Sequence, residues 1–364
     1  MIGGSGNDFF TGSSGADVFN GGTGNDNLNG GDGNDTYTFA NGWGNDSISD
    51  TTGIDTVNLS AVTTALSVNM APSSGNEVSD GTNLINWSDT IENLTTGSGN
   101  DTVNGTSGDN MITLGAGSDA VWGAAGNDNL DGGDGNDRYV YTGAWGNDWI
   151  QDSSGIDTLD FRTDASNLTV NLAASTGNKA TDGTSTINWT GNIIENVWAG
   201  TGTNVITGSS LANSLIGGTG LNTLNGGAGN DTLQGGTGNS TYQFALGDGQ
   251  DTIIETGGTD TVSFNSSITQ SNVAFFQTST GNLQVGYVNS TGDVITILGQ
   301  TTASSAVEKF QLSNGNFMTN ADVNAVIQAM TSYASSHSGT DFSSLSAVEN
   351  NTNLMNIVNS RWHS

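Results

Sequence analysis

Residues 3–38 form four successive nonapeptides, which read G-G-S-G-N-D-F-F-T, G-S-S-G-A-D-V-F-N, G-G-T-G-N-D-N-L-N and G-G-D-G-N-D-T-Y-T. With positions numbered 1 to 9, each unit has Gly at positions 1 and 4, Asp at position 6 and an apolar or aromatic residue at position 8. Glycine permits a tight turn, aspartate supplies a hard oxygen ligand, and the residue at position 8 can point into a core. The period therefore predicts a repeat architecture whose turns carry carboxylates.

The same register continues through three arrays, from Gly3 to Asn58, from Thr96 to Asp160 and from Ala199 to Ser263. Position 8 is apolar or aromatic in all twenty frames of these arrays, whereas position 6 varies. Fifteen frames have Asp at position 6, namely Asp8, Asp17, Asp26, Asp35, Asp46, Asp55, Asp101, Asp119, Asp128, Asp137, Asp148, Asp157, Asp231, Asp251 and Asp260. The other five have Asn110, Asn204, Asn213, Asn222 and Ser240. The apolar residue expected to form the core is thus kept in every frame. The carboxylate expected to be a ligand is lost mainly in the third array.

These nonapeptides resemble the RTX (repeats-in-toxin, haemolysin-type) calcium-binding repeats, whose pattern is G-G-x-G-x-D-x-U-x with U apolar. The resemblance implies an all-β fold, a calcium-loaded parallel β-roll in which two nonapeptides complete one coil and frames i and i+2 stack. It also implies that each ion is shared between two turns, with the position-6 Asp and turn carbonyls as ligands. That role carries over to the fifteen Asp residues above and does not extend directly to the five Asn and Ser positions.

Stacking would place Asp8 near Asp26 at the strand spacing of about 4.8 Å. Two unit charges at that distance repel by about 3 kcal/mol near a protein surface. The chain has 36 acidic but only 5 basic residues, so few cationic side chains offset this repulsion. Carboxylates and Gly-rich turn carbonyls form an oxygen cage suited to calcium, whereas zinc prefers Cys or His, and His337 and His363 lie outside the arrays. We therefore expect several Ca²⁺ ions as the cofactor.

The composition excludes several classes of protein. A formal charge of −31 argues against binding to nucleic acid or to anionic membrane surfaces. The absence of Cys excludes disulfides and thiolate metal sites. Only 33% of residues are hydrophobic, which is too little for a broad globular core but enough for a solenoid. We find no transmembrane run and no N-terminal signal peptide, so we expect either a fragment cut at a repeat boundary or export by another signal.

A longer repeat of about a hundred residues overlies the nonapeptides, because Trp43 matches Trp145 and Trp87 matches Trp189. We expect Trp87 and Trp189 to be packing anchors rather than a sugar-binding surface. Trp43 and Trp145, at turn position 3, are expected to be more exposed but still to serve packing rather than recognition. The predicted segments are residues 1–60 (first array), 61–95 (β-rich connection), 96–160 (second array), 161–198 (β-rich connection), 199–264 (degenerate third array), 265–318 (β cap) and 319–364 (helix and C-terminal secretion signal).

The last segment is predicted to contain a helix capped by Thr319 or Asn320, with one apolar face. That face comprises Val323, Val326, Ile327 and Met330. In RTX-like proteins the uncleaved type I secretion signal lies at the extreme C-terminus, and this position matches. A docking helix or a disordered tail is the alternative interpretation of the last thirty residues.

The sequence indicates no catalytic residues, because it lacks an H-E-x-x-H zinc-protease motif and a G-x-S-x-G nucleophile elbow. We predict a secreted, bacterial, extracellular or cell-surface calcium-binding β-roll that folds on calcium outside the cell. Its expected partners are calcium and, through its C-terminus, the type I secretion machinery, without membrane insertion. The alternative is a structural surface protein, an adhesin stalk or surface-layer component, that self-associates at the cell surface.

Overall fold

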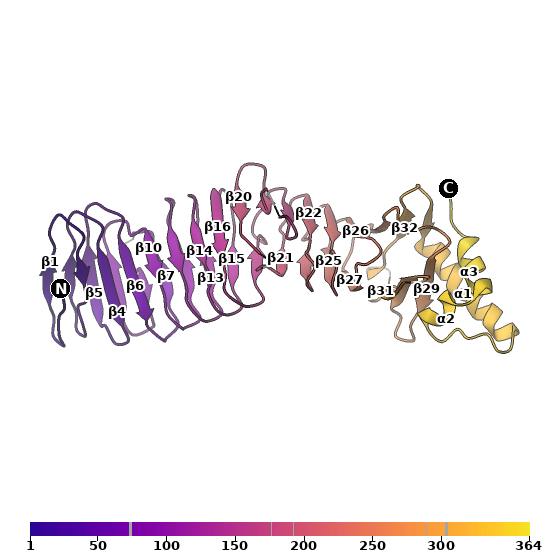
Figure 1. The fold of residues 1–364 in the computed structure, drawn as a ribbon, viewed down its shortest axis with the longest axis horizontal. Coiled ribbons are helices and arrows are strands. Elements are labelled where there is room, and N and C mark those ends of the chain that lie inside the picture. The colour runs from indigo at the N-terminus through magenta and orange to yellow at the C-terminus, as the bar shows by residue number, and fades with distance from the viewer. Residues whose placement is uncertain (73–74, 176, 192, 289, 303–304) are drawn as a thin grey trace. The chain divides into compact units, whose positions relative to one another are not determined.

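Each nonapeptide folds as a turn followed by a short strand that contains position 8 (Figure 1). The structure is a computed structural model and describes residues 1–72, 75–175, 177–191, 193–288, 290–302 and 305–364. Contacts divide the chain into two compact units. Unit 1 comprises Met1–Phe161 and Ser175–Ile194, and unit 2 comprises Arg162–Ala174 and Glu195–Ser364. The seven-segment division given above is finer than this one and stays a prediction.

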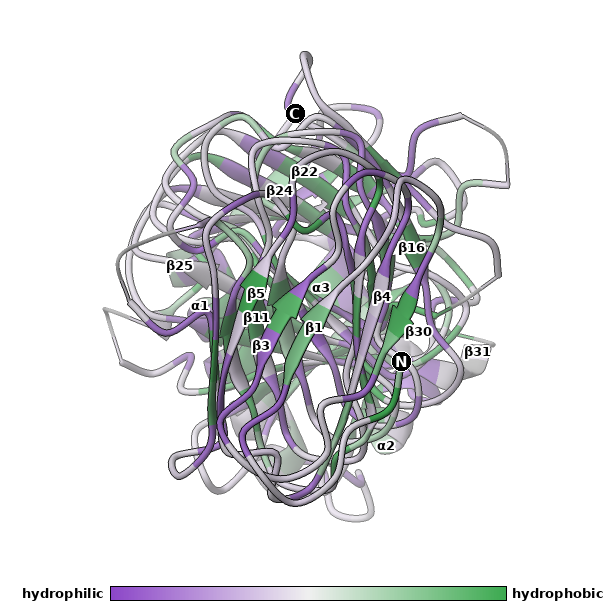
Figure 2. Cartoon of the chain, turned by 90° about the vertical axis from the view of Figure 1, so that its left-hand side faces the viewer, coloured by the Kyte–Doolittle hydropathy of each residue, from purple (hydrophilic) through white to green (hydrophobic). Residues whose placement is uncertain are grey.

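Unit 1 contains two sheets built mainly from parallel strands. In pairing order, one sheet consists of β1 (Phe9–Thr11), β3 (Asn27–Asn29), β5 (Asn45–Ser49), β9 (Leu84–Trp87), β8 (Val78–Ser79), β7 (Ser67–Asn69), β11 (Thr102–Asn104), β13 (Ala120–Trp122), β15 (Arg138–Val140) and β17 (Thr158–Asp160). The other consists of β2 (Val18–Phe19), β4 (Thr36–Ala40), β6 (Thr56–Ala61), β10 (Asn93–Thr95), β12 (Met111–Thr113), β14 (Asn129–Asp131), β16 (Asn147–Gln151), β20 (Thr186–Asn188) and β19 (Ala180–Thr181). Seen from the N-terminal end, the labels of β1, β3, β5 and β11 lie to one side of those of β4 and β16 (Figure 2).

The strand register stacks the position-8 residues of alternate frames, as the period predicts. Leu28 pairs with Phe10 on one side and with Ile48 on the other. In the opposite sheet Val57 pairs with both Tyr37 and Leu94. These side chains are buried, except that Phe10 in the first coil is half-buried. Each coil therefore buries its few apolar residues against its neighbours, which explains how a chain with little hydrophobic material forms a core.

The connection at residues 61–95 continues the roll of unit 1. Its strand β9 pairs with β5 in parallel, and β10 inserts between β6 and β12. The short strands β7 and β8 pair antiparallel and link β9 to β11. The sheet therefore passes through a segment that lacks the nonapeptide pattern.

The four repeated tryptophans are all buried, as predicted for one pair and not for the other. Trp87 and Trp189 are buried, which confirms the packing prediction. The prediction that Trp43 and Trp145 are more exposed is wrong, because both are fully buried. A two-residue insertion precedes each turn and supplies an aromatic partner: the Trp145 ring lies 5.6 Å from that of Tyr141. Edge-to-face packing of aromatic rings in the core thus overrides the tendency of a turn position to be exposed.

Unit 2 also contains two sheets. One comprises β21 (Asn196–Trp198), β23 (Ser214–Ile216), β25 (Thr232–Gly236), β27 (Gln250–Glu255), β31 (Ser290–Ile297), β30 (Leu283–Tyr287) and β29 (Val273–Gln277). The other comprises β18 (Thr169–Asn171), β22 (Asn204–Thr207), β24 (Asn222–Asn225), β26 (Ser240–Phe244), β28 (Thr261–Phe264), β32 (Lys309–Leu312) and β33 (Phe317–Thr319). Antiparallel pairing of β29, β30 and β31, and of β32 and β33, forms the β cap of the roll.

Three helices follow the β cap: α1 (Asn320–Ser336), α2 (Leu345–Glu349) and α3 (Thr352–Asn359). Thr319 is the N-cap of α1 and forms a capping box with Asp322, which confirms one of the two predicted caps. The predicted apolar face of α1 is buried. Helix α2 packs on β29 and β30, and α3 packs on β29. No helix in the described part of the chain is long and apolar enough to cross a membrane.

Candidate metal centre

The position-6 aspartates form columns in which each carboxylate contacts the preceding coil. In unit 1, Asp26 Oδ1 accepts a hydrogen bond from the Asp8 backbone N–H at 2.8 Å. Asp46 Oδ1 accepts one from the Asp26 N–H at 2.7 Å. The second column repeats this contact, since Asp55 Oδ1 accepts from the Asp35 N–H at 2.8 Å. One oxygen of each carboxylate therefore serves to hold successive turns together.

The other carboxylate oxygen is buried and has no hydrogen-bond partner at many of these positions. Among the described residues, this holds for Oδ2 of Asp26, Asp35, Asp46, Asp101, Asp119, Asp128, Asp137, Asp148 and Asp231. A buried polar atom without a partner costs about 1–3 kcal/mol, and more when it carries charge. A column of such oxygens therefore fits a cation.

Backbone carbonyls line the same turns. Gly22 and Gly24 adopt φ angles of 94° and 137°, a region in which side-chain-bearing residues are strained. A Cβ atom on Gly22 would lie 2.1 Å from the carbonyl oxygen of Gly4, and one on Gly24 would lie 2.3 Å from that of Gly6. Carbonyl oxygens of one turn thus point at the next turn of the column, and only glycine leaves room there. Carboxylate and carbonyl oxygens together form the donor set that calcium prefers.

Electrostatics supports the same interpretation. Burial raises the pKa of Asp46 and Asp119 to about 7 and that of Asp128 to about 8. Burial also raises the pKa of Asp148 and Asp251 to about 7. Neighbouring carboxylates add to the shift at each of these sites. Ionising all the carboxylates of such a column is therefore unfavourable without a counterion. A divalent cation beside them would offset that cost.

The first two frames differ from the later ones. Asp8 and Asp17 are half-buried, and their Oδ2 atoms already accept backbone N–H bonds from Gly4 at 2.9 Å and Ser13 at 2.7 Å. The hydrogen bonds from Ser13 lower the pKa of Asp17. These two carboxylates therefore have protein donors at the oxygen that is unpartnered in Asp26, Asp35 and Asp46.

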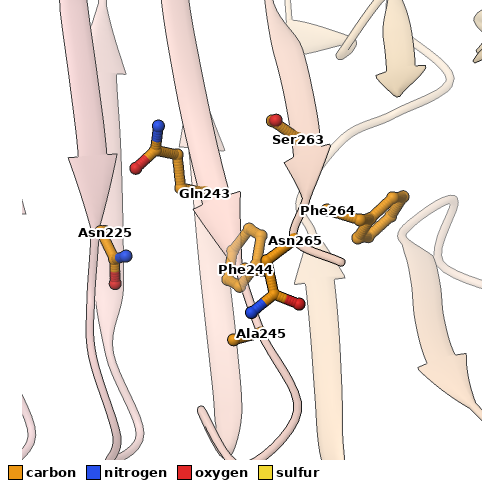
Figure 3. Close-up of a pocket in the computed structure, with 7 residues that line it drawn as sticks. All are labelled: Asn225, Gln243, Phe244, Ala245, Ser263, Phe264 and Asn265. Atoms are coloured by element: carbon orange, nitrogen blue, oxygen red, sulfur yellow. The ribbon is translucent and has the colours of Figure 1, made fainter. Parts of the chain in front are cut away.

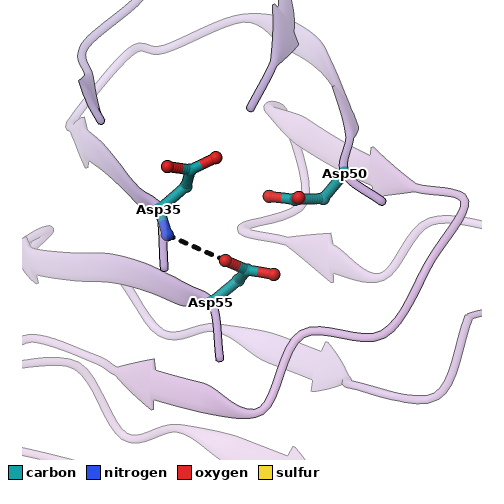
Figure 4. Close-up of side chains that lie close together, drawn as sticks. All are labelled: Asp35, Asp50 and Asp55. Carbon is teal, nitrogen blue, oxygen red and sulfur yellow. Dashed lines mark hydrogen bonds between the residues drawn. The ribbon is translucent and has the colours of Figure 1, made fainter. Parts of the chain in front are cut away.

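Two clusters bring a third carboxylate into the column. The carboxylates of Asp35, Asp50 and Asp55 each offer an oxygen within 4.8 Å of the others, as Figure 4 shows. Tyr37 Oη donates a hydrogen bond of 2.5 Å to Asp50 Oδ2. The Tyr37 hydroxyl thus fixes the orientation of the Asp50 carboxylate. The cluster contains three carboxylates, of which Asp35 has a buried oxygen without a hydrogen-bond partner.

The second array repeats this cluster with Asp137, Asp152 and Asp157. Tyr139 Oη donates to Asp152 Oδ2 at 2.6 Å, and burial raises the pKa of Asp152 to about 8. Sequence reasoning missed Asp50 and Asp152. The signal was present, because the last frame of each array has an acidic residue in place of Gly at position 1.

Glutamates outside the arrays extend the columns. Glu92 Oε2 accepts a hydrogen bond from the Asp55 N–H at 2.8 Å, and Glu308 Oε2 accepts one from the Asp260 N–H at 2.7 Å. Both stand two residues before a buried apolar side chain, Leu94 or Phe310. The spacing of positions 6 and 8 thus survives without the glycines, which is the signal that would have identified them.

The remaining predicted aspartates lie in the same columns. Asp101 Oδ1 accepts from the Leu66 N–H, and Asp251 Oδ1 accepts from the Asp231 N–H. Asp260 Oδ1 accepts from the Ser240 N–H at 2.7 Å. Twelve of the fifteen predicted aspartates directly precede a strand, and Asp46, Asp148 and Asp251 are the second residues of β5, β16 and β27.

A surface pocket in unit 2 is lined by Asn225, Gln243, Phe244, Ala245, Ser263, Phe264 and Asn265 (Figure 3). No titratable side chain lines it, so its chemistry is that of amides and aromatic rings. The carboxylates of the molecule are concentrated in the turns instead.

The fold and the turn chemistry define the class of protein, a calcium-binding parallel β-roll. The family model for the RTX calcium-binding nonapeptide repeat (4 copies) matches residues 2–37, 88–121, 95–130, 104–139, 142–160 and 207–242. The chain therefore carries RTX calcium-binding repeats in several copies, and these repeats are structural elements rather than catalytic ones. No curated protein matches the chain.

Proposed function

We propose that this chain is a calcium-folded module of a secreted bacterial protein, and that the position-6 aspartates are its calcium ligands. The buried, unpartnered Oδ2 atoms of Asp26, Asp35 and Asp46 carry this proposal. The carbonyls of Gly4 and Gly6 approach the turn that bears Asp26, so both kinds of oxygen lie in one column. A bound calcium ion would supply the positive charge that these oxygens lack.

The chain's own residues account for calcium-dependent folding. With 36 acidic and 5 basic residues, the carboxylates repel one another in the absence of a cation. Low hydrophobicity provides little compensation, so the chain stays unfolded where calcium is scarce. Weak extracellular sites have dissociation constants of about 10⁻⁴ to 10⁻³ M, and binding free energy becomes folding free energy outside the cell.

The proposal extends to export and location. An unfolded chain suits threading through a type I secretion channel, and folding in calcium outside would prevent its return. We further propose that the segment with α2 and α3 carries the type I secretion signal that the resemblance to RTX proteins implies. We propose an extracellular or cell-surface location and no catalytic role for this chain.

Circular dichroism during a calcium titration of the chelator-treated chain tests the proposal. We expect the β signal to rise cooperatively with calcium. A full β signal in chelator that calcium leaves unchanged would refute it. Sedimentation in the same buffers tests self-association at a cell surface.

A further inference from the structure

One column of unit 2 has three successive position-6 residues that are not aspartate, before it reaches Asp260. It contains Asn204, Asn222 and Ser240, which are 0%, 3% and 2% exposed. Strands β22, β24 and β26 begin at these residues, and Asn204 pairs with Asn222, which pairs with Ser240. The column therefore keeps the stacking of the roll while its position-6 chemistry changes.

The two asparagine amides point at turn oxygens. Asn204 Nδ2 lies 3.1 Å from the Gly202 carbonyl oxygen, 2.9 Å from that of Gly217 and 3.1 Å from Asn222 Oδ1. Each of the three is an acceptor, so the nitrogen of the amide must face them. Asn204 Oδ1 in turn accepts from the Leu168 N–H, the contact that Asp101 Oδ1 makes with Leu66 in unit 1.

Asn222 repeats the arrangement one coil further on. Its Nδ2 lies 3.0 Å from the Gly220 carbonyl oxygen and 2.9 Å from that of Gly235, with Gly218 at 3.4 Å. A Cβ on Gly217 would lie 2.8 Å from Asn222 Nδ2, just as one on Gly21 would lie 2.1 Å from Asp26 Oδ2. The amide nitrogen thus occupies the place in the turn that the unpartnered carboxylate oxygen occupies in unit 1.

We propose that the side-chain amides of Asn204 and Asn222 take the place of the cation, so that the turns of these two residues are held together without calcium. The N–H groups of each amide satisfy turn carbonyls, while Asn204 Oδ1 accepts the Leu168 N–H and Asn222 Oδ1 accepts from the Asn204 amide. The inference rests on the proposed function, because it specifies which turns of a calcium-folded roll take no ion.

Asn110 and Asn213 show that the residue type alone does not produce this arrangement. Asn213 Oδ1 accepts the Ser209 N–H at 2.7 Å, and its Nδ2 donates outward to the Glu195 carbonyl at 3.0 Å. Asn110 does the same with Thr106 and Glu92. In these turns the oxygen faces inward, so they serve as matched controls.

The test measures bound calcium per chain by equilibrium dialysis, together with thermal unfolding, for variants of the full chain. For Asn204→Ala/Asn222→Ala we expect unchanged calcium stoichiometry and a lower melting temperature. For Asn204→Asp/Asn222→Asp we expect at least one additional bound ion and a stability that depends more steeply on calcium. As a charge-matched control, Asn314→Asp/Asn353→Asp adds two carboxylates at exposed positions outside the columns and should gain no ion.

A loss of bound calcium in the alanine variant would overturn the inference, because the asparagines would then be ligands. It would equally fail if the aspartate variant gained no ion, or if that variant did not fold even in saturating calcium. A wild-type chain that bound no calcium would refute the proposed function alone. The amide contacts would then be judged by whether the alanine variant melts below the wild type in chelator.

Discussion

The column of Asp26 and Asp46 in unit 1 and the column of Asn204 and Asn222 in unit 2 share one backbone plan but solve its charge problem differently. In the first, each turn presents a buried carboxylate oxygen without a partner. In the second, an amide nitrogen donates to carbonyls of two turns at about the same place. The change of one terminal atom from oxygen to nitrogen converts an acceptor into a donor and removes a negative charge. On the proposed function, position 6 determines whether a turn takes a cation, while position 8 keeps its core role in both columns.

The largest expected difference between the two columns is in how their backbone amide exchange responds to a lower calcium concentration. When free calcium is lowered from saturation to just above the folding midpoint, backbone amides around Asp26 and Asp46 should exchange hydrogen about 100-fold faster, since unrelieved repulsion of about 3 kcal/mol per stacked pair favours local opening. Amides around Asn204 and Asn222 should change much less. Hydrogen–deuterium exchange with mass spectrometry measures both, and equal acceleration in the two columns would contradict the comparison.

A single ligand substitution should have the next largest effect. Asp26→Ala removes both the unpartnered Oδ2 and the hydrogen bond to the Asp8 N–H, so it should lower the number of bound calcium ions and raise the calcium needed for folding. Asn213→Ala should leave the ion number unchanged, because its amide contacts only protein groups. Equilibrium dialysis with a circular dichroism titration gives both quantities. Equal losses of calcium would show that the assignment of ligand turns is wrong.

The pH response of the calcium-free chain should have the opposite sign to that of most folded proteins. Burial raises the pKa of Asp46, Asp119 and Asp148 to about 7 and of Asp128 to about 8, well above the value of 3.8 for an unperturbed Asp. The folded state therefore binds more protons than the unfolded chain between about pH 4 and 8, and its stability falls as pH rises through 7 to 8. In chelator we expect more β signal at pH 5 than at pH 8. With calcium present, acid should instead raise the calcium midpoint, because protons compete for the same oxygens. A chelated chain with more β signal at pH 8 would contradict this prediction.

The three-carboxylate clusters should show a smaller effect. Asp50→Asn and Asp152→Asn keep an acceptor for the tyrosine hydroxyl but remove one charge, so calcium affinity should fall by about tenfold at the affected site. Glu255→Gln is the matched control in unit 2, where Tyr242 contacts Glu255 but Ser240 stands at the position-6 site. With fewer carboxylates there, we expect a weaker response. Isothermal titration calorimetry of the three variants ranks the losses.

The smallest expected effect is independent of calcium. Thr319→Ala removes the N-cap of α1 and should lower stability by about 1 kcal/mol. The loss should be the same at moderate and at saturating calcium, because the cap lies outside the columns. A loss that vanished in saturating calcium would show that α1 is coupled to the metal sites. Denaturant unfolding at two calcium concentrations measures it.

Much of the fold could be predicted because the nonapeptide is a local pattern. Position 8 recurs in register, so Phe10, Leu28 and Ile48 had to stack once the strands paired in parallel. The burial of Trp43 and Trp145 could not be predicted from their turn position, since it depends on aromatic partners brought together by the coil. The candidate ligands followed from the same period, but Asp50, Asp152, Glu92 and Glu308 did not, because they depart from the glycine pattern.

The sequence by itself determined the spacing of core side chains and carboxylates along the chain, because glycine, aspartate and an apolar residue act within one turn and its neighbours. The two-frame coil and calcium as the ion followed from the resemblance to RTX repeats. Only the tertiary structure decided which atom of a position-6 side chain faces inward. Asn204 turns its nitrogen toward carbonyls of successive turns, while Asn213 turns its oxygen toward the Ser209 N–H. That choice depends on which carbonyl of a neighbouring coil the amide meets: Asn204 Nδ2 donates to Gly217, thirteen residues further along the chain, whereas Asn213 Nδ2 donates to Glu195, eighteen residues back.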